Sequence, residues 1–253
     1  MADHPLKGST IAVTRPREQA AQLVNRIEDA GGISFLFPLL EIGPVNDGAL
    51  NEQVARLAHF DMAIFVSPNA VRFGMAAIRE ADRLPAHLKI ATVGQGSAKA
   101  LREAGVTDII APAVRFDSEG LLELPELQDV TGRSVMIFRG DGGRELLGDT
   151  LRARGATVEY ATCYRRSNVR QDPQALLGAK PDAITVTSSE ALSYLRQMLD
   201  GDTWKALREI PVFVPHQRIA ELAINQGWQH VQLTMSGDEG LLSALIAWAH
   251  QKA

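Results

Sequence analysis

The sequence predicts an α/β protein of two similar domains, each a parallel sheet flanked by helices, with a two-stranded β ladder joining them. Three observations support this fold class. Short apolar segments alternate with amphipathic helical segments, which is typical of parallel sheets covered by helices. Several strand–helix units recur later in the chain. Two apolar stretches of strand character stand apart from these units, and each has the position of a crossover between domains.

The first strand–helix unit sets the pattern for the rest. Residues 10–14 predict a buried strand. Pro16 opens a helix, because a proline's missing N–H costs nothing in the first turn, and Gly31-Gly32 ends it. Further strands are predicted at 61–66, 89–93, 108–110, 133–138, 183–187, 211–214 and 230–233. Further helices are predicted at 47–58, 68–79, 96–104, 143–154, 173–177, 189–199, 217–226 and 239–250.

An internal repeat relates the two halves of the chain. Residues 61–71 parallel 182–192 at an offset of 121, and residues 13–31 parallel 137–155 at an offset of 124. Residues 89–105 parallel 210–227 at a similar offset. Three units in the same order indicate a duplicated domain.

The apolar stretches 33–42 and 158–166 decide between two ways of dividing the chain. A tandem duplication would place the boundary near Asp129. If the two stretches are crossovers, residues 1–36 pack with 167–253 and residues 43–158 form an inserted domain. We expect this discontinuous arrangement, with a ligand cleft between the domains.

Composition excludes several functions. The net charge of −4 argues against a general nucleic-acid binder. Cys163 is the only cysteine, which excludes an internal disulfide and a cysteine-based zinc site, and packing is its expected role. The histidines are isolated in sequence, so no metal site is expected. The apolar runs are too short to cross a bilayer and residues 1–9 lack a signal-peptide core, so a cytoplasmic location is expected.

The predicted ligand-binding positions follow the strands, since ligands bind beyond the carboxyl ends of parallel strands. Each position combines small or polar residues with a helix start, where free N–H groups attract anions, although helix capping requires the same residue types. The candidate residues are Thr14, Arg15, Ser67, Asn69, Gln95, Ser97, Arg139, Gly140, Ser188, Ser189 and Arg218.

Tyr160 is the candidate acid, because its phenol is protonated at neutral pH and can donate a proton or a hydrogen bond. A tyrosine that only packs in the core is the alternative. Strand alternation places Tyr164 on the same face, where surface or hinge packing is expected. Gly94-Gln95-Gly96 lacks the third glycine of a dinucleotide-binding loop, so a nucleotide-dependent enzyme is disfavoured.

The order and spacing of several motifs resemble the uroporphyrinogen-III synthase family. The motifs are Val-Thr-Arg-Pro (13–16), Phe-Pro-Leu-Leu-Glu-Ile (37–42), Phe-Val-Ser-Pro-Asn-Ala-Val (65–71), Val-Gly-Gln-Gly-Ser-Ala (93–98), Glu-Tyr-Ala-Thr-Cys-Tyr-Arg-Arg (159–166), Val-Thr-Ser-Ser-Glu-Ala-Leu (186–192) and Pro-His-Gln-Arg-Ile-Ala (215–220). The resemblance covers nearly the whole chain. It implies two α/β domains, with the first strand–helix unit belonging to the C-terminal domain.

The resemblance also implies a reaction. The family is a cyclising lyase that converts hydroxymethylbilane to uroporphyrinogen III, with inversion of ring D and loss of water, in tetrapyrrole and heme biosynthesis. Hydroxide departs to give an azafulvene, and ring D re-closes inverted through a spiro intermediate. No cofactor is implied. Tyr160 matches the tyrosine proposed to assist departure, and Ser67, Asn69, Ser97, Ser188 and Ser189 match substrate-facing positions.

One segment departs from the family pattern. Many members have Ile-Gly-x-x-Thr where this chain has Val-Pro-His-Gln-Arg (214–218), so Arg218 is expected to replace that threonine by binding a carboxylate. The expected partner is the small-molecule substrate, with no nucleic acid or membrane, and a monomer in transient contact with the preceding pathway enzyme. The alternative function is a non-enzymatic polycarboxylate- or tetrapyrrole-binding module on the same scaffold.

Overall fold

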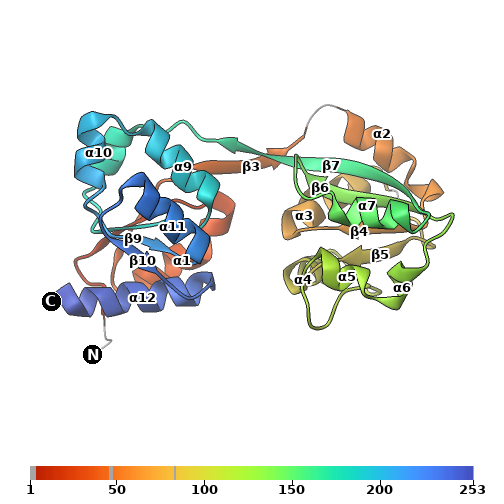
Figure 1. Ribbon diagram of the computed structural model, residues 1–253, viewed down its shortest axis with the longest axis horizontal. Coiled ribbons are helices and arrows are strands. Elements are labelled where there is room, and N and C mark those ends of the chain that lie inside the picture. Colours follow the sequence, from red (N-terminus) through yellow and green to blue (C-terminus); the bar gives the residue numbers. More distant parts are fainter. Residues whose placement is uncertain (1–3, 46–47, 83, 253) are drawn as a thin grey trace. The chain divides into compact units, whose positions relative to one another are not determined.

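A computed structural model describes residues 4–45, 48–82 and 84–252 (Figure 1). The chain divides into two compact units. Unit 1 comprises Met1–Glu41 and Ser167–Ala253, and unit 2 comprises Ile42–Arg166. The predicted helix start at Asp47 lies outside the described residues.

Strands and helices alternate along most of the chain, as predicted. The strands are β1 (Thr10–Val13), β2 (Ile33–Leu36), β3 (Leu40–Pro44), β4 (Met62–Phe65), β5 (Lys89–Thr92), β6 (Ser134–Gly140), β7 (Thr157–Asn168), β8 (Ala183–Thr185), β9 (Val212–Val214) and β10 (Val231–Leu233). The helices are α1 (Arg17–Asp29), α2 (Ala49–Ala55), the 3-10 helix η1 (Leu57–His59), α3 (Pro68–Glu80), α4 (Gln95–Glu103), α5 (Ser118–Leu122), α6 (Pro125–Gln128), α7 (Leu146–Ala153), α8 (Pro173–Gly178), α9 (Ser189–Met198), α10 (Gly201–Leu207), α11 (Gln217–Gln226) and α12 (Gly237–Lys252).

Four neighbouring strands repeat in order and in register between the two sheets, β2-β1-β8-β9 in one and β7-β6-β4-β5 in the other. Unit 1 has the order β10-β9-β8-β1-β2, and the other sheet has the order β3-β7-β6-β4-β5. Ile11 pairs with Ala183 in the first sheet, and Val135 pairs with Met62 in the second. These pairs correspond through the offsets of 124 and 121 found in the sequence. The repeat is therefore structural, because equivalent residues hold equivalent positions in the strands.

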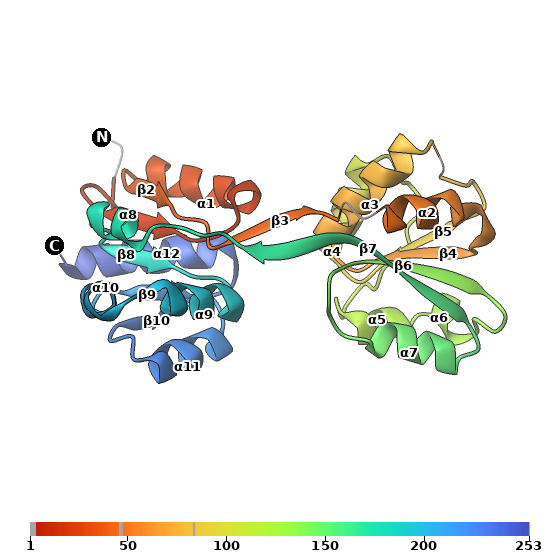
Figure 2. The same cartoon turned by 90° about the horizontal axis from the view of Figure 1, so that it is seen from above.

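Each sheet is buried on both faces, as expected for parallel strands. In unit 2, Ala63 and Phe65 pack on one face with α2 and α3, while Met62 and Ile64 pack on the other with α5 and α7. Figure 2 shows these helices on opposite sides of the sheet. In unit 1, α1 and α12 cover one face and α8 to α11 cover the other. This burial is the main source of stability, at about 25 cal/mol for each Å² of apolar surface removed from water.

The apolar stretch 33–42, predicted as one crossover, is divided between two strands. Its first half is β2, which pairs in parallel with β1 inside unit 1. Its second half enters β3, which neighbours β7 in the second sheet. Pro38 lies between the two strands, where its missing N–H interrupts the ladder. The chain therefore leaves unit 1 through β3 and returns through β7.

A β-bulge changes the facing of the side chains in β7. Arg139 of β6 is opposite Thr162, but the next residue, Gly140, is opposite Tyr164, so Cys163 is the extra residue. A bulge reverses the alternation of side chains beyond it. Tyr164 consequently packs with the cluster on the α3 face, whereas Tyr160 packs on the α7 face. The prediction that both tyrosines share a face is wrong for this reason.

None of the described helices is both long enough and apolar enough to cross a bilayer.

Gly74 provides a test of the unit 2 core. It lies in α3 above Phe65 and Phe138, whose rings stack at 4.6 Å, and a Cβ there would lie 2.7 Å from Phe138. The Gly74→Ala substitution should lower the free energy of unfolding by about 1–2 kcal/mol, because overpacking exceeds the gain of about 1 kcal/mol in helix propensity. Gly201→Ala, at a position with open space, should be neutral or stabilising. Urea unfolding of both variants checks this, and equal stability would contradict it.

Candidate binding pocket in unit 2

A pocket of about 230 Å³ lies at the carboxyl ends of the unit 2 strands. Its lining contains four of the predicted site residues, namely Ser67, Arg139, Gly140 and Tyr160. Because β6, β4 and β5 are parallel neighbours, the residues that follow them meet at one edge of the sheet. The volume is smaller than that of a typical small-molecule site, so the pocket suits one part of a large ligand.

The charges of the lining favour an anion. Arg139, Arg144 and Arg166 line the pocket together with Asp141. Guanidinium groups bind carboxylates through paired hydrogen bonds. A larger hollow of about 380 Å³ lies beside Cys163, but its charged lining residue is Glu80. The smaller pocket is therefore the better candidate for an acidic ligand.

Arg139 is held on three sides. Its side chain is only 9% exposed, and its Nη1 donates to Oε1 of Glu145 at 2.8 Å. Its guanidinium carbon lies 4.6 Å from the centre of the Tyr160 ring. Gly143 approaches so closely that a Cβ there would lie 3.0 Å from Nη2. The nearby Tyr160 phenol, followed by Arg139, lowers the pKa of Glu145, so this carboxyl is ionised at neutral pH.

Tyr164 presents its hydroxyl to the pocket. Its Oη lies 3.1 Å from Oγ of Ser67, and either atom can be the donor. Ser67 also caps α3 by accepting from the N–H of Ala70, which fixes its rotamer. Gly140 makes this arrangement possible, because a Cβ there would lie 2.6 Å from the Tyr164 ring. Sequence reasoning missed Tyr164, since the bulge that turns it toward Ser67 has no signal in the sequence.

Tyr160 lines the pocket, but its hydroxyl oxygen is buried in the protein. Its Oη is buried and makes no hydrogen bond of ordinary geometry. The oxygen packs against Gly148 of α7, where a Cβ would lie only 2.0 Å away. Burial raises the pKa of Tyr160, and the Glu145 carboxylate raises it further. This geometry suits a ring that supports Arg139 better than it suits a proton donor.

The other predicted residues of unit 2 lie outside this lining. Asn69 is half-buried in the first turn of α3, and Gln95 is exposed at the start of α4. Ser97 is 3% exposed, so it lies on the packed side of α4. Helix capping at Ser67 and packing at Ser97 are the structural roles that their residue types allow.

The predicted residues of unit 1 also follow parallel neighbouring strands, but several already have partners. Thr14 is buried and donates to the carbonyl of Thr185 at 2.7 Å. Arg15 forms an ion pair with Asp238. Ser188 caps α9 by accepting from the N–H of Ala191.

Two further predicted residues of unit 1 lie at helix starts. Oγ of Ser189 is buried and has no hydrogen-bond partner among the described residues. Arg218 is exposed in the first turn of α11, so its guanidinium is accessible to a carboxylate.

Cys163 has a packing role. It is fully buried, and its thiol donates to the carbonyl of Arg139 at 3.2 Å. Burial raises the pKa of Cys163 to about 12, so the nucleophilic thiolate is scarce at neutral pH. Within the part of the chain that the structure describes, no group of three or more His, Cys, Asp and Glu side chains is arranged to hold a metal ion.

The contact between Gly148 and Tyr160 gives a testable prediction. Gly148→Ala should destabilise the protein by about 2–3 kcal/mol, since the added methyl overlaps the phenol oxygen. Tyr160→Phe removes that oxygen, so the double variant should recover part of the loss. Thermal unfolding of the two single variants and the double variant measures the coupling. Simply additive effects would show that the two residues do not meet.

The chain is similar over most of its length to curated proteins. It is 35% identical over 249 residues to uroporphyrinogen-III synthase of Escherichia coli (strain K12), with 93% of this chain and 99% of the relative covered. It is 34% identical to uroporphyrinogen-III synthase of Synechococcus elongatus, with 99% of each covered. The family model "Uroporphyrinogen-III synthase HemD" matches residues 21–242.

Solved structures show the same fold. A crystal structure of a mutant uroporphyrinogen III synthase from the extremely thermophilic bacterium Thermus thermophilus matches 97% of this chain and 100% of its own, with a TM-score of 0.60 and 22% identity. A structure of uroporphyrinogen-III synthetase from Helicobacter pylori gives a TM-score of 0.59 at 15% identity, with 97% and 100% covered. These findings confirm the resemblance drawn from the motifs, and the chain belongs to the uroporphyrinogen-III synthase family.

Proposed function

We propose that this chain cyclises hydroxymethylbilane to uroporphyrinogen III with loss of water, and that the unit 2 pocket binds part of this substrate. The observation that carries the site assignment is the lining, which joins three arginines to a phenol–hydroxyl pair. Hydroxymethylbilane bears carboxylates on every ring, and it must lose a hydroxyl before it closes. The pocket offers cations for the first property and donors for the second.

Tyr164 is the best-placed donor for the departing hydroxyl. A phenol that shares a hydrogen bond with Ser67 can turn its proton toward a substrate oxygen, while Ser67 satisfies the phenol oxygen. The departing group then leaves as water, and the Tyr164 phenolate regains a proton from the substrate as the macrocycle closes, since the overall reaction loses only water. Tyr160 has a supporting role in this proposal, since its ring lies against Arg139 and its oxygen is buried.

The remaining roles follow from exposure and charge. Arg139 binds a substrate carboxylate, and exposed Arg218 binds another. Asn69, Gln95, Ser188 and Ser189 supply polar groups near the strand ends. The chain acts as a monomer in the cytoplasm on substrate received from the preceding pathway enzyme, and these last assignments follow from the family alone.

A product assay tests the reaction. Purified protein given freshly made hydroxymethylbilane should yield the type III isomer after oxidation and chromatographic separation of the products. Spontaneous closure gives only the type I isomer, so a type I product alone would contradict the proposal. Tight binding of uroporphyrin without turnover would favour a non-enzymatic binding module instead.

A pair of tyrosine variants tests the donor. Tyr164→Phe should lower kcat about 100-fold, because it removes the group that protonates the departing oxygen. Tyr160→Phe should lower kcat much less, since its hydroxyl is buried against α7. Single-turnover rates and circular dichroism of both variants make the comparison. The opposite order of effects would return the donor role to Tyr160.

A further inference from the structure

The internal repeat also includes residues 118–122, whose first residue, Ser118, lines the pocket. Residues 118–122 read Ser-Glu-Gly-Leu-Leu, and residues 238–242 read Asp-Glu-Gly-Leu-Leu, at an offset of 120. A Cβ on Gly120 would lie 1.9 Å from the carbonyl oxygen of Arg115, and one on Gly240 would lie 2.2 Å from that of Met235. The same close approach at the same offset makes α5 and the start of α12 equivalent.

The strand registers make Arg15 and Arg139 equivalent in turn. β1 and β6 correspond at the offset of 124, because Thr10 pairs with Ile33 as Ser134 pairs with Thr157. The helices that follow also correspond, since α1 packs on α12 and α7 packs on α5. Each unit therefore has an arginine at the end of an equivalent strand, next to an equivalent helix start.

The residue opposite the arginine differs between the units. In unit 1 it is Asp238, which forms an ion pair with Arg15, and the two side chains are only 11% and 15% exposed. In unit 2 the equivalent position is Ser118, which lines the pocket together with Arg139. A buried ion pair is costly to break, because separation leaves an uncompensated charge. Arg15 therefore stays paired with Asp238, whereas Ser118 of α5 has no carboxylate to pair with Arg139.

Arg139 is paired instead with Glu145, whose side chain is far more exposed than that of Asp238. The Glu145 side chain is 53% exposed and lies beyond a loop in which Gly142 and Gly143 have positive φ. A half-exposed carboxylate regains water when it leaves its partner, which lowers the cost of separating it from the guanidinium. A substrate carboxylate that takes the place of Glu145 keeps the buried Arg139 charge paired, so the exchange leaves no uncompensated charge.

We propose that, of the two equivalent arginines, only Arg139 of unit 2 binds a substrate carboxylate. Arg15 is already paired with Asp238, whereas the equivalent residue in unit 2, Ser118, carries no charge that could pair with Arg139. Ser118 thus determines the specificity of the pocket for a carboxylate. Glu145 pairs with Arg139 until a substrate carboxylate replaces it. The inference rests on the proposed function for the identity of the ligand. It also narrows the predicted site, since it removes Arg15 from substrate binding.

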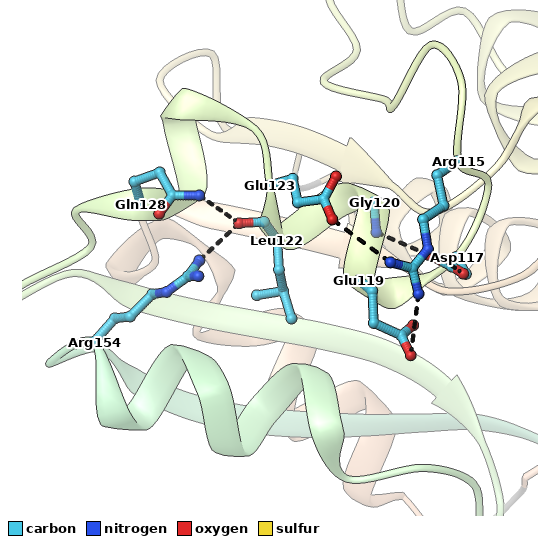
Figure 3. A network of polar contacts seen from close by, with 8 residues as sticks. All are labelled: Arg115, Asp117, Glu119, Gly120, Leu122, Glu123, Gln128 and Arg154. Carbon is cyan, nitrogen blue, oxygen red and sulfur yellow. Dashed lines mark hydrogen bonds and ion pairs between the residues drawn. The ribbon is translucent and has the colours of Figure 1, made fainter.

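The fixed position of α5 makes a side-chain swap informative. Arg115 binds Asp117, Glu119 and Glu123, while Arg154 and Gln128 both donate to the carbonyl of Leu122 (Figure 3). Asp117 also caps the helix by accepting from the N–H of Gly120. Ser118 takes part in none of these contacts. A change at this position should therefore leave α5 in place.

The experiment introduces an aspartate at position 118, so that it can pair with Arg139 as Asp238 pairs with Arg15. Ser118→Asp should raise KM for hydroxymethylbilane and Kd for uroporphyrin about tenfold each, since one charge-assisted contact is worth about 1.4 kcal/mol. Ser118→Asn has the same size without the charge, and its effect should be much smaller. Equal effects of the two substitutions, or a KM and Kd unchanged by Ser118→Asp, would overturn the inference.

Two further variants cover the case in which Ser118→Asp fails to fold. Glu145→Gln removes the carboxylate that competes with the ligand for Arg139, so it should lower Kd about threefold. A higher Kd would overturn the inference. Asp238→Asn should lower Tm by about 6–12 °C, because it leaves the buried Arg15 charge uncompensated, while KM and Kd stay as in the parent protein. A change of Kd in this variant would also overturn it.

The two readouts separate the inference from the proposed function. Uroporphyrin is a polycarboxylate whose binding is followed by fluorescence and requires no turnover. If the parent protein makes no type III isomer, the proposed function fails, and the Kd values still test the arginine. If type III isomer is made and the Kd values do not move, the inference alone fails.

Discussion

The shared direction and register of the strands is the constraint on which the rest of the structure depends. In each unit three neighbouring strands end at the same edge of the sheet. The candidate residues follow those ends, form the end of β6 or lie on the adjoining strand β7. Burial of both faces fixes this register, since a slip of one residue would exchange the side chains that β4 and β6 pack against α2 and α3 with those that they pack against α5 and α7. The pocket is therefore a consequence of core packing.

The close packing of the pocket depends on small residues as much as on functional ones. Gly140 gives room to the Tyr164 ring, and Gly148 gives room to the Tyr160 hydroxyl. Each glycine allows an aromatic ring to lie where a side chain would otherwise stand. The arrangement of Arg139 between Tyr160 and Glu145 then follows, because the ring and the carboxylate occupy two sides of the guanidinium.

Much of this was predictable from the sequence. The alternation of apolar segments gave the strands and helices, and the spacing of the repeats matches the registers of both sheets. Arg139, Ser67 and Gly140 were placed at strand ends, where the pocket lies. The role of Tyr164 was not predictable, because it depends on one bulge opposite Arg139 and Gly140 that local sequence does not encode. The Glu-Gly-Leu-Leu repeat is visible in the sequence, and it is enough to show that Ser118 and Asp238 hold equivalent positions.

The return of the chain through β7 has a consequence for folding. The two segments of unit 1 are separated by all of Ile42–Arg166, and β3 and β7 are neighbours where the chain enters and leaves that insert. Bringing distant segments together carries an entropic cost that grows with the length of flexible chain between them. An insert that has already folded, with β3 paired to β7, shortens that span to a few residues. Assembly of the discontinuous unit should accordingly be fastest after the continuous one has formed.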